Sequence, residues 1–178
     1  MQEEYVVLVN EDDREIGQLE KMEAHRLGVL HRAFSVVLFN SKGELLLQQR
    51  AAHKYHSPLL WTNACCSHPR PEESVLNAAK RRLQEEMGMS AKLQEGFHFI
   101  YKAKLDQGLT EHELDHVVFA YADQDPQINI EEVEAFKWIS LSELLQDLEK
   151  YPHAYTAWFK ILLNQHLEAL SKAAYESV

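Results

Sequence analysis

The sequence has few cysteines, glycines and prolines, and each scarcity removes one way of building a protein. It contains 2 cysteines, 6 glycines and 5 prolines in 178 residues. Cys65 and Cys66 are neighbours, so a bond between them would close a small strained ring and join no distant segments. We therefore expect reduced thiols and a fold held by a hydrophobic core, for which 178 residues are enough. Because no Pro-, Gly- or Ser-rich linker interrupts the chain, we expect residues 1–178 to form one domain.

Long apolar runs are also missing. None approaches the roughly 20 residues that a membrane-spanning helix needs. Residues 1–5 are acidic and lack the basic and apolar regions of a signal peptide. We therefore expect a cytoplasmic protein that does not bind a membrane.

Positive charge is scarce relative to negative charge. Lys and Arg together number 18, Asp and Glu together number 28, and the formal net charge is -10. Most of such a surface repels a polyanion, so nucleic acid is not expected as a partner. A ligand that carries phosphate would have to bind in a local basic pocket.

The spacing of apolar residues predicts the strands. A turn at residues 40–43 predicts a β-hairpin between the strands on either side of it. Residues 51–60 read as an exposed loop. The predicted strands cover residues 5–9, 32–39, 44–49, 97–104, 114–122 and 135–139.

Helical spacing is clearest in the middle of the chain. An apolar residue recurs at every fourth position, at Val75, Ala79, Leu83 and Met87, and Gly88 is suited to end the helix. Predicted helices cover residues 20–26, 74–87, 140–150 and 155–173. Strands and helices interleave without a regular βαβ period. The pattern predicts an α/β (α+β) sandwich with a mixed β-sheet.

The segment from residue 67 to residue 88 resembles the Nudix box, G-x5-E-x7-R-E-U-x-E-E-x-G-U, in which U is aliphatic. The residues in register are Glu73, Arg81, Leu83, Glu85, Glu86 and Gly88. Ser67 replaces the first glycine, and Arg82 replaces the first helical glutamate. An arginine there removes a metal ligand and adds a cation, which predicts impaired hydrolysis and favoured diphosphate binding. The alternative interpretation is an ordinary surface helix with ion pairs along its polar side.

Three histidines and two glutamates form a candidate metal site: His25, His31, His68, Glu111 and Glu113. Glu111 and Glu113 are two residues apart, so on an extended segment both carboxylates project to one side. This donor set suits Zn²⁺, Mn²⁺ or Mg²⁺. Taken singly, any of the 10 histidines is more often exposed or a hydrogen-bonded core residue, so spacing alone leaves both interpretations open.

Cys66 lies two residues before His68 and could act as a nucleophile, a proton donor or a buried structural thiol. Because neighbours in a strand face opposite ways, Cys65 and Cys66 should not enter the same pocket. Trp158, near the start of the last predicted helix, could equally be a core residue.

The order and spacing of several segments closely resemble the type I isopentenyl diphosphate isomerases, from Lys21 to the region of Trp158. The matching segments are residues 24–25, 30–35, 61–63, 66–69 and 111–113. This resemblance implies a Nudix-like α/β/α sandwich with a mixed β-sheet. It also implies an enzyme that interconverts isopentenyl and dimethylallyl diphosphate without cleaving phosphate.

The resemblance further assigns residues to roles. One divalent metal ion (Zn, Mn or Mg) would be held by His25, His31, His68, Glu111 and Glu113, and one Mg²⁺ would arrive with the substrate diphosphate at Glu86. Cys66 and Glu113 would be the acid/base pair, with Tyr101 beside them and Trp158 facing the cationic intermediate. The phosphate oxygens would be neutralised by Lys21, Arg50, Lys54 and Arg82. The partner would be a small isoprenyl diphosphate, and the protein a monomer or weak homodimer.

Two other functions fit the same motifs. A Nudix diphosphohydrolase would release phosphate or a nucleoside monophosphate, which Arg82 in the box argues against. A metal-stabilised binding module would capture a diphosphate without turnover and would not need Cys66.

Overall fold

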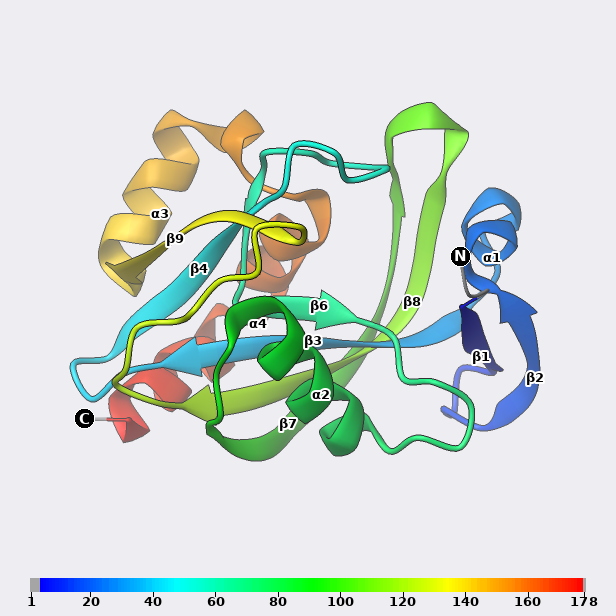
Figure 1. The fold of residues 1–178 in the computed structure, drawn as a ribbon, viewed down its shortest axis with the longest axis horizontal. Helices are drawn as coiled ribbons and strands as arrows, with labels where there is room; N and C mark the ends of the chain where they lie inside the picture. Colours follow the sequence, from blue (N-terminus) through cyan, green and yellow to red (C-terminus); the bar gives the residue numbers. More distant parts are fainter. Residues whose placement is uncertain (1–3, 178) are drawn as a thin grey trace.

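The computed structural model describes residues 4–177 as one curled sheet with helices on both faces (Figure 1). The strands are β1 (Tyr5–Val9), β2 (Glu15–Glu20), β3 (His31–Phe39), β4 (Glu44–Arg50), β5 (Trp61–Thr62), β6 (Cys65–Ser67), β7 (Lys92–Lys104), β8 (Thr110–Tyr121) and β9 (Val133–Ser140). The helices are α1 (Lys21–Leu27), α2 (Val75–Met87), α3 (Leu141–Lys150) and α4 (Ala157–Glu176), with short 3-10 turns η1 (Asp106–Gly108) and η2 (Pro152–Ala154).

The sheet is mixed, as predicted. β3 and β8 run parallel along their whole paired length, from His31 opposite Glu113 to Phe39 opposite Tyr121. The other strand pairs are antiparallel. The strands β4, β5, β6 and β7 and the helix α2 lie between β3 and β8 in the chain. The parallel pair therefore joins segments that are far apart in the sequence.

Two hydrophobic cores lie on opposite faces of the sheet. Successive residues of β3 point to opposite faces, so Val36 and Leu38 pack with α2, whereas Val37 and Phe39 pack with α3 and α4. All four of these side chains are fully buried. Figure 1 shows α2 in front of the sheet and α4 behind it. The predicted sandwich is therefore confirmed.

Side-chain caps and one glycine set the ends of α2 and α3. The Ser74 hydroxyl accepts a hydrogen bond from the Asn77 amide at the start of α2, and Ser140 forms the predicted capping box with Glu143. At the end of α2, Gly88 has φ 60°, and a Cβ there would lie 2.5 Å from the Gln127 carbonyl oxygen. Position 88 therefore requires glycine for both its conformation and its space.

Two predictions need correction. Residues 40–43 do form a turn, but β3 and β4 pair only at Phe39 and Leu45. They then diverge, because β6 pairs with the middle of β3 while β9 and β5 pair with β4. The predicted hairpin is thus confirmed at its turn and at the antiparallel pair next to it, but it does not extend along the strands.

The second correction concerns the loop at residues 51–60, which is irregular but not exposed throughout. Ala51, His56 and Ser57 are buried. The loop reaches the turn η1 between β7 and β8, where the amide of Ser57 donates a hydrogen bond to the Asp106 carboxylate. The strands β2, β5 and β6 were not predicted, since they are short or lack regular alternation.

No helix within residues 4–177 is both long and apolar enough to cross a membrane.

Candidate active site

Four side chains from four separate segments meet at one end of the sheet. They are His25 on α1, His31 at the start of β3, His68 after β6 and Glu113 on β8, and one ligand atom of each lies within 4.8 Å of the others. The parallel pairing of β3 with β8 sets His31 opposite Glu113, and so brings these two side chains together. The sequence prediction placed all four in one site, and the structure brings them together.

Hydrogen bonds at Nδ1 orient the imidazole rings of His25 and His31. His25 Nδ1 lies 2.7 Å from the Lys21 carbonyl oxygen, and His31 Nδ1 lies 2.9 Å from that of Val29. A carbonyl oxygen can only accept, so both Nδ1 atoms carry the proton and both Nε2 atoms present a lone pair. His25 Nε2 is buried and has no hydrogen-bond partner within residues 4–177.

These features fit a bound metal ion. A fully buried imidazole with an unpaired acceptor nitrogen is costly unless a ligand meets it. His31 Nε2 and His68 Nε2 also lie 3.3 Å apart, and each is close to Glu113 Oε1. Three imidazole nitrogens and one carboxylate oxygen are the donors that Zn²⁺ and related ions take.

Glu111 lies beside this group but is not one of the four converging ligands. Its Oε2 and the Oε2 of Glu113 lie 2.9 Å and 2.7 Å from the Tyr101 hydroxyl, which bridges them. Burial and the neighbouring Glu113 raise the pKa of Glu111 well above its usual value. Burial would also raise the pKa of Glu113, but the adjacent imidazoles of His31 and His68 outweigh it and hold that pKa well below the usual value.

The thiol of Cys66 is held by three polar groups. It donates to Asn63 Oδ1 at 2.9 Å, accepts from Trp158 Nε1 at 3.2 Å, and lies 3.7 Å from the Ser35 hydroxyl. Burial and the nearby Asp115 raise the pKa of Cys66 to about 12. At neutral pH the side chain is therefore a protonated thiol and not a thiolate nucleophile.

Cys65 and Cys66 face opposite sides of the sheet, as predicted from strand alternation. Cys65 is fully buried in the core beneath α2. Cys66 lines a pocket and touches the other core. Only Cys66 can therefore act on a bound molecule.

A single pocket joins these groups to the predicted cations. Its walls include all the predicted site residues except His25 and His31, which lie behind it: Lys21, Arg50, Lys54, Cys66, His68, Arg82, Glu86, Tyr101, Glu111, Glu113 and Trp158. The side chains of Lys21, Lys54 and Arg82 are 17% to 23% exposed, whereas Tyr101, Glu111 and Glu113 are buried. The pocket thus has a basic, more accessible mouth and buried acid/base groups.

Each cation at the mouth already has a partner. Lys21 pairs with Glu4 at 2.7 Å, and Arg82 pairs with Glu86 at 2.5 Å. Lys54 forms an ion pair with Glu132. Arg50 lies 5.3 Å from the centroid of the Trp158 ring and donates to the His56 carbonyl oxygen.

Sequence reasoning missed several residues around the pocket. Asp115 continues the two-residue alternation of Glu111 and Glu113 on β8, a signal that was available. It accepts from Ser35 at 2.7 Å, and burial together with Glu113 raises its pKa to about 8. His56 gave no such signal, because it belongs to the loop that was expected to be exposed.

Comparisons with a family model and with known proteins indicate the same family. A model of the NUDIX domain matches residues 29–159. Isopentenyl-diphosphate Delta-isomerase of Pectobacterium atrosepticum is 52% identical over 156 residues, which cover 88% of this chain and 87% of that protein. Isopentenyl-diphosphate Delta-isomerase 2 of Aromatoleum aromaticum is 47% identical over 169 residues, covering 95% and 89%.

Solved structures show the same fold at low identity. DR0079 from Deinococcus radiodurans has a TM-score of 0.75 and 19% identity, covering 92% of this chain and 99% of its own. The MutT protein from Methanosarcina mazei Go1 has a TM-score of 0.62 and 17% identity, with coverages of 83% and 94%.

Proposed function

The chain belongs to the isopentenyl-diphosphate Delta-isomerase family of NUDIX proteins, and from this premise we propose how its residues interconvert isopentenyl and dimethylallyl diphosphate. The reaction moves a double bond by adding a proton at the terminal carbon and removing one from the allylic carbon. Two separately placed acid/base groups are therefore required. One observation carries the proposal: the Cys66 thiol and the Glu113 carboxylate line one pocket, whose mouth is basic.

Cys66 and Glu113 are the acid/base pair. The thiol keeps its proton at neutral pH, while Glu113 Oε2 receives the hydrogen bond from Tyr101. Tyr101 therefore orients the Glu113 carboxylate and can relay a proton to or from it. The direction of the reaction decides which member of the pair adds the proton.

The cationic intermediate needs a dry site with compensating charge, because water would capture a tertiary carbocation. Cys66, Tyr101 and Glu113 all come from strands that cover the inner end of the pocket. Trp158 adds an indole ring, which is worth on the order of 2 kcal/mol to a desolvated cation above its face. The ring already lies near Arg50, so we infer that the diphosphate must neutralise Arg50 before the ring can stabilise a second cation.

The remote diphosphate holds the isoprenyl tail in register. Its oxygens would be bound by Lys21, Arg50, Lys54 and Arg82, and Glu86 would hold a Mg²⁺ that arrives with the diphosphate. Glu86 is 5% exposed and uses one oxygen for Gln48 and the other for Arg82. Each carboxylate oxygen still has a free lone pair for a cation.

A protein-bound divalent ion, Zn²⁺, Mn²⁺ or Mg²⁺, would be held by His25, His31, His68 and Glu113, with the adjacent Glu111 as the fifth proposed ligand. It would fix Glu113 in place and supply positive charge beside the two buried carboxylates. A cytoplasmic location and a monomeric or weakly dimeric state stay predictions.

The test is ¹H and ³¹P NMR of the purified protein with isopentenyl diphosphate and Mg²⁺ in D₂O. We expect deuterated dimethylallyl diphosphate with the diphosphate signals intact. Release of phosphate would favour a hydrolase. No change in metal-replete protein would favour a binding module.

A further inference from the structure

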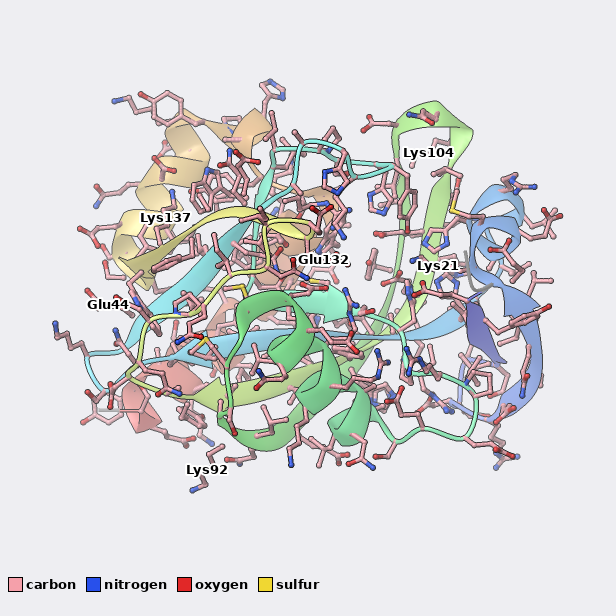
Figure 2. The ribbon with its side chains drawn as sticks, viewed as in Figure 1. Lys21, Glu44, Lys92, Lys104, Glu132 and Lys137 are labelled. Carbon is pink, nitrogen blue, oxygen red and sulfur yellow. The ribbon has the colours of Figure 1, made fainter. Side chains whose placement is uncertain are left out.

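Glu132 lies beside the pocket, in the segment that leads into β9, and neither the NUDIX pattern nor the order of the site residues points to it. We propose that Glu132 is a positioning residue for the diphosphate, which holds Lys54 and Arg82 together before the ligand arrives. This inference rests on the proposed role of these two cations. In Figure 2 the side chain of Glu132 lies beside α2, near the middle of the view.

A single oxygen of Glu132 contacts both cations. Oε2 accepts a hydrogen bond from Lys54 Nζ and lies 3.5 Å from the Nη2 atom of Arg82. The three side chains are 17% to 25% exposed. Lys54 comes from the loop after β4 and Arg82 comes from α2, so this contact joins two walls of the pocket.

The backbone of Glu132 is anchored to the same two walls. Its carbonyl oxygen accepts from the Ala51 amide at 3.1 Å, and its own amide donates to Asn129 at 2.9 Å. The Asn129 amide in turn donates to the carbonyl oxygen of Glu86 on α2. The carboxylate is therefore held in place from both sides, and not by its contact with Lys54 alone.

No other carboxylate within residues 4–177 forms ion pairs with two of the four predicted diphosphate cations. Glu4 pairs with Lys21, and Glu86 pairs with Arg82. Burial would raise the pKa of Glu132, but the contacts with Lys54 and Arg82 hold it below its usual value, so the side chain is ionised at neutral pH.

The physical role follows from charge and from side-chain freedom. Two cations that share one region repel each other, and a lysine without a partner samples many rotamers. A fixed carboxylate between them offsets the repulsion and orders Lys54 in advance. Diphosphate binding then requires less ordering, which is how preorganisation increases affinity.

The first test is steady-state kinetics of Glu132→Gln with isopentenyl diphosphate. Gln keeps the size of the side chain but loses the charge, so we expect KM to rise about tenfold while kcat changes by less than about threefold. Glu132→Asp, which keeps the charge, should raise KM less than Gln does. An unchanged KM in Glu132→Gln would show that the carboxylate does not assist binding, and a lower KM would show that it repels the ligand; either result would overturn the inference.

A neighbouring residue provides the matched control. Glu131 has a side chain that is 81% exposed, and its nearest cationic partner is His53 at 4.0 Å. Glu131→Gln removes the same charge one residue away and should leave KM unchanged. An equal rise of KM in both variants would mean that general surface charge is responsible, which also contradicts the inference.

A double-mutant cycle with Lys54→Met separates this inference from the proposed function. If Glu132 acts largely through Lys54, Glu132→Gln should add less than about twofold to KM when Lys54 is already Met. Effects that multiply in full would contradict the inference. If Lys54→Met raises KM and Glu132→Gln does not, only the inference fails. If Lys54→Met leaves KM unchanged, the diphosphate role of Lys54 fails and the inference fails with it.

Discussion

The indole Nε1 of Trp158 donates a hydrogen bond to Sγ of Cys66 at 3.2 Å, although the two residues are 92 positions apart in the chain. Trp158 begins the C-terminal helix on one face of the sheet, and Cys66 lies on β6. The bond, together with Asn63, fixes the direction of the thiol proton. Because Asn63 donates through its amide to two backbone carbonyls, its oxygen must face the thiol.

The two cysteines provide a matched pair of variants. Cys66→Ala should reduce kcat by about 10³-fold or more with the fold retained, because the general acid/base group is lost. Cys65→Ala should keep most of the activity and lower the free energy of unfolding by about 1 kcal/mol, since it leaves a small gap in the core. Steady-state kinetics and urea unfolding of both variants test this. Equal activity of the two would remove Cys66 from the mechanism.

Trp158→Phe separates the hydrogen bond from the aromatic ring. Phe retains a ring in the pocket but cannot donate to Cys66, so we expect kcat to fall about fivefold, the equivalent of one lost hydrogen bond of roughly 1 kcal/mol. KM should change little, because Phe keeps an aromatic ring beside Arg50 and the other three diphosphate cations do not contact position 158. A variant with wild-type kcat would show that the hydrogen bond does not contribute.

Metal content tests the histidine site directly. His25→Ala should reduce the bound divalent metal from about one ion per chain to near zero, because no other group replaces the lost imidazole ligand. Elemental analysis measures the metal content. His98→Ala is the control, since His98 is exposed on β7. Chelation of the wild type should lower its Tm, and added metal should restore it. Full metal content in His25→Ala would contradict the proposed site.

A pH dependence is expected from Glu73, which binds Arg81 through both carboxylate oxygens at 2.8 Å and 2.9 Å. Hydrogen bonds from Arg81 lower the pKa of Glu73 from 4.5, against a smaller effect of burial. The pair therefore stabilises the fold above the unfolded-state pKa, and this contribution is lost as the pH falls through the lower folded-state pKa.

The variant Glu73→Gln should lower the free energy of unfolding at pH 7 by about 1–2 kcal/mol. The difference from the wild type should begin to shrink as the pH falls below 4.5, and it should vanish only below the lowered folded-state pKa, where the wild-type carboxylate is also neutral. Urea unfolding at pH 7 and at pH 4 measures it. Glu72→Gln, in the same turn but with an exposed side chain, should show no difference at either pH.

The sequence by itself determined the local elements whose signals lie within a few residues. The four-residue spacing before Gly88, the capping box at Ser140 and the alternation of Glu111 and Glu113 all correspond to structure. It also supplied the family, because the order of His25, His31, Cys66 and His68 is specific. These features depend on backbone geometry and on residue types that are fixed along the chain.

Only the tertiary structure decided which of these side chains meet. The parallel pairing of β3 with β8 joins residues about 80 positions apart, and no local pattern encodes that register. The predicted hairpin pairs only beside its turn, because β4 then pairs with β9 and not with the rest of β3. His56 reaches the pocket because its loop packs against Trp158 and Glu111, and Glu132 reaches it because the segment before β9 contacts Arg82 on α2. Such contacts follow from packing, which acts between distant segments.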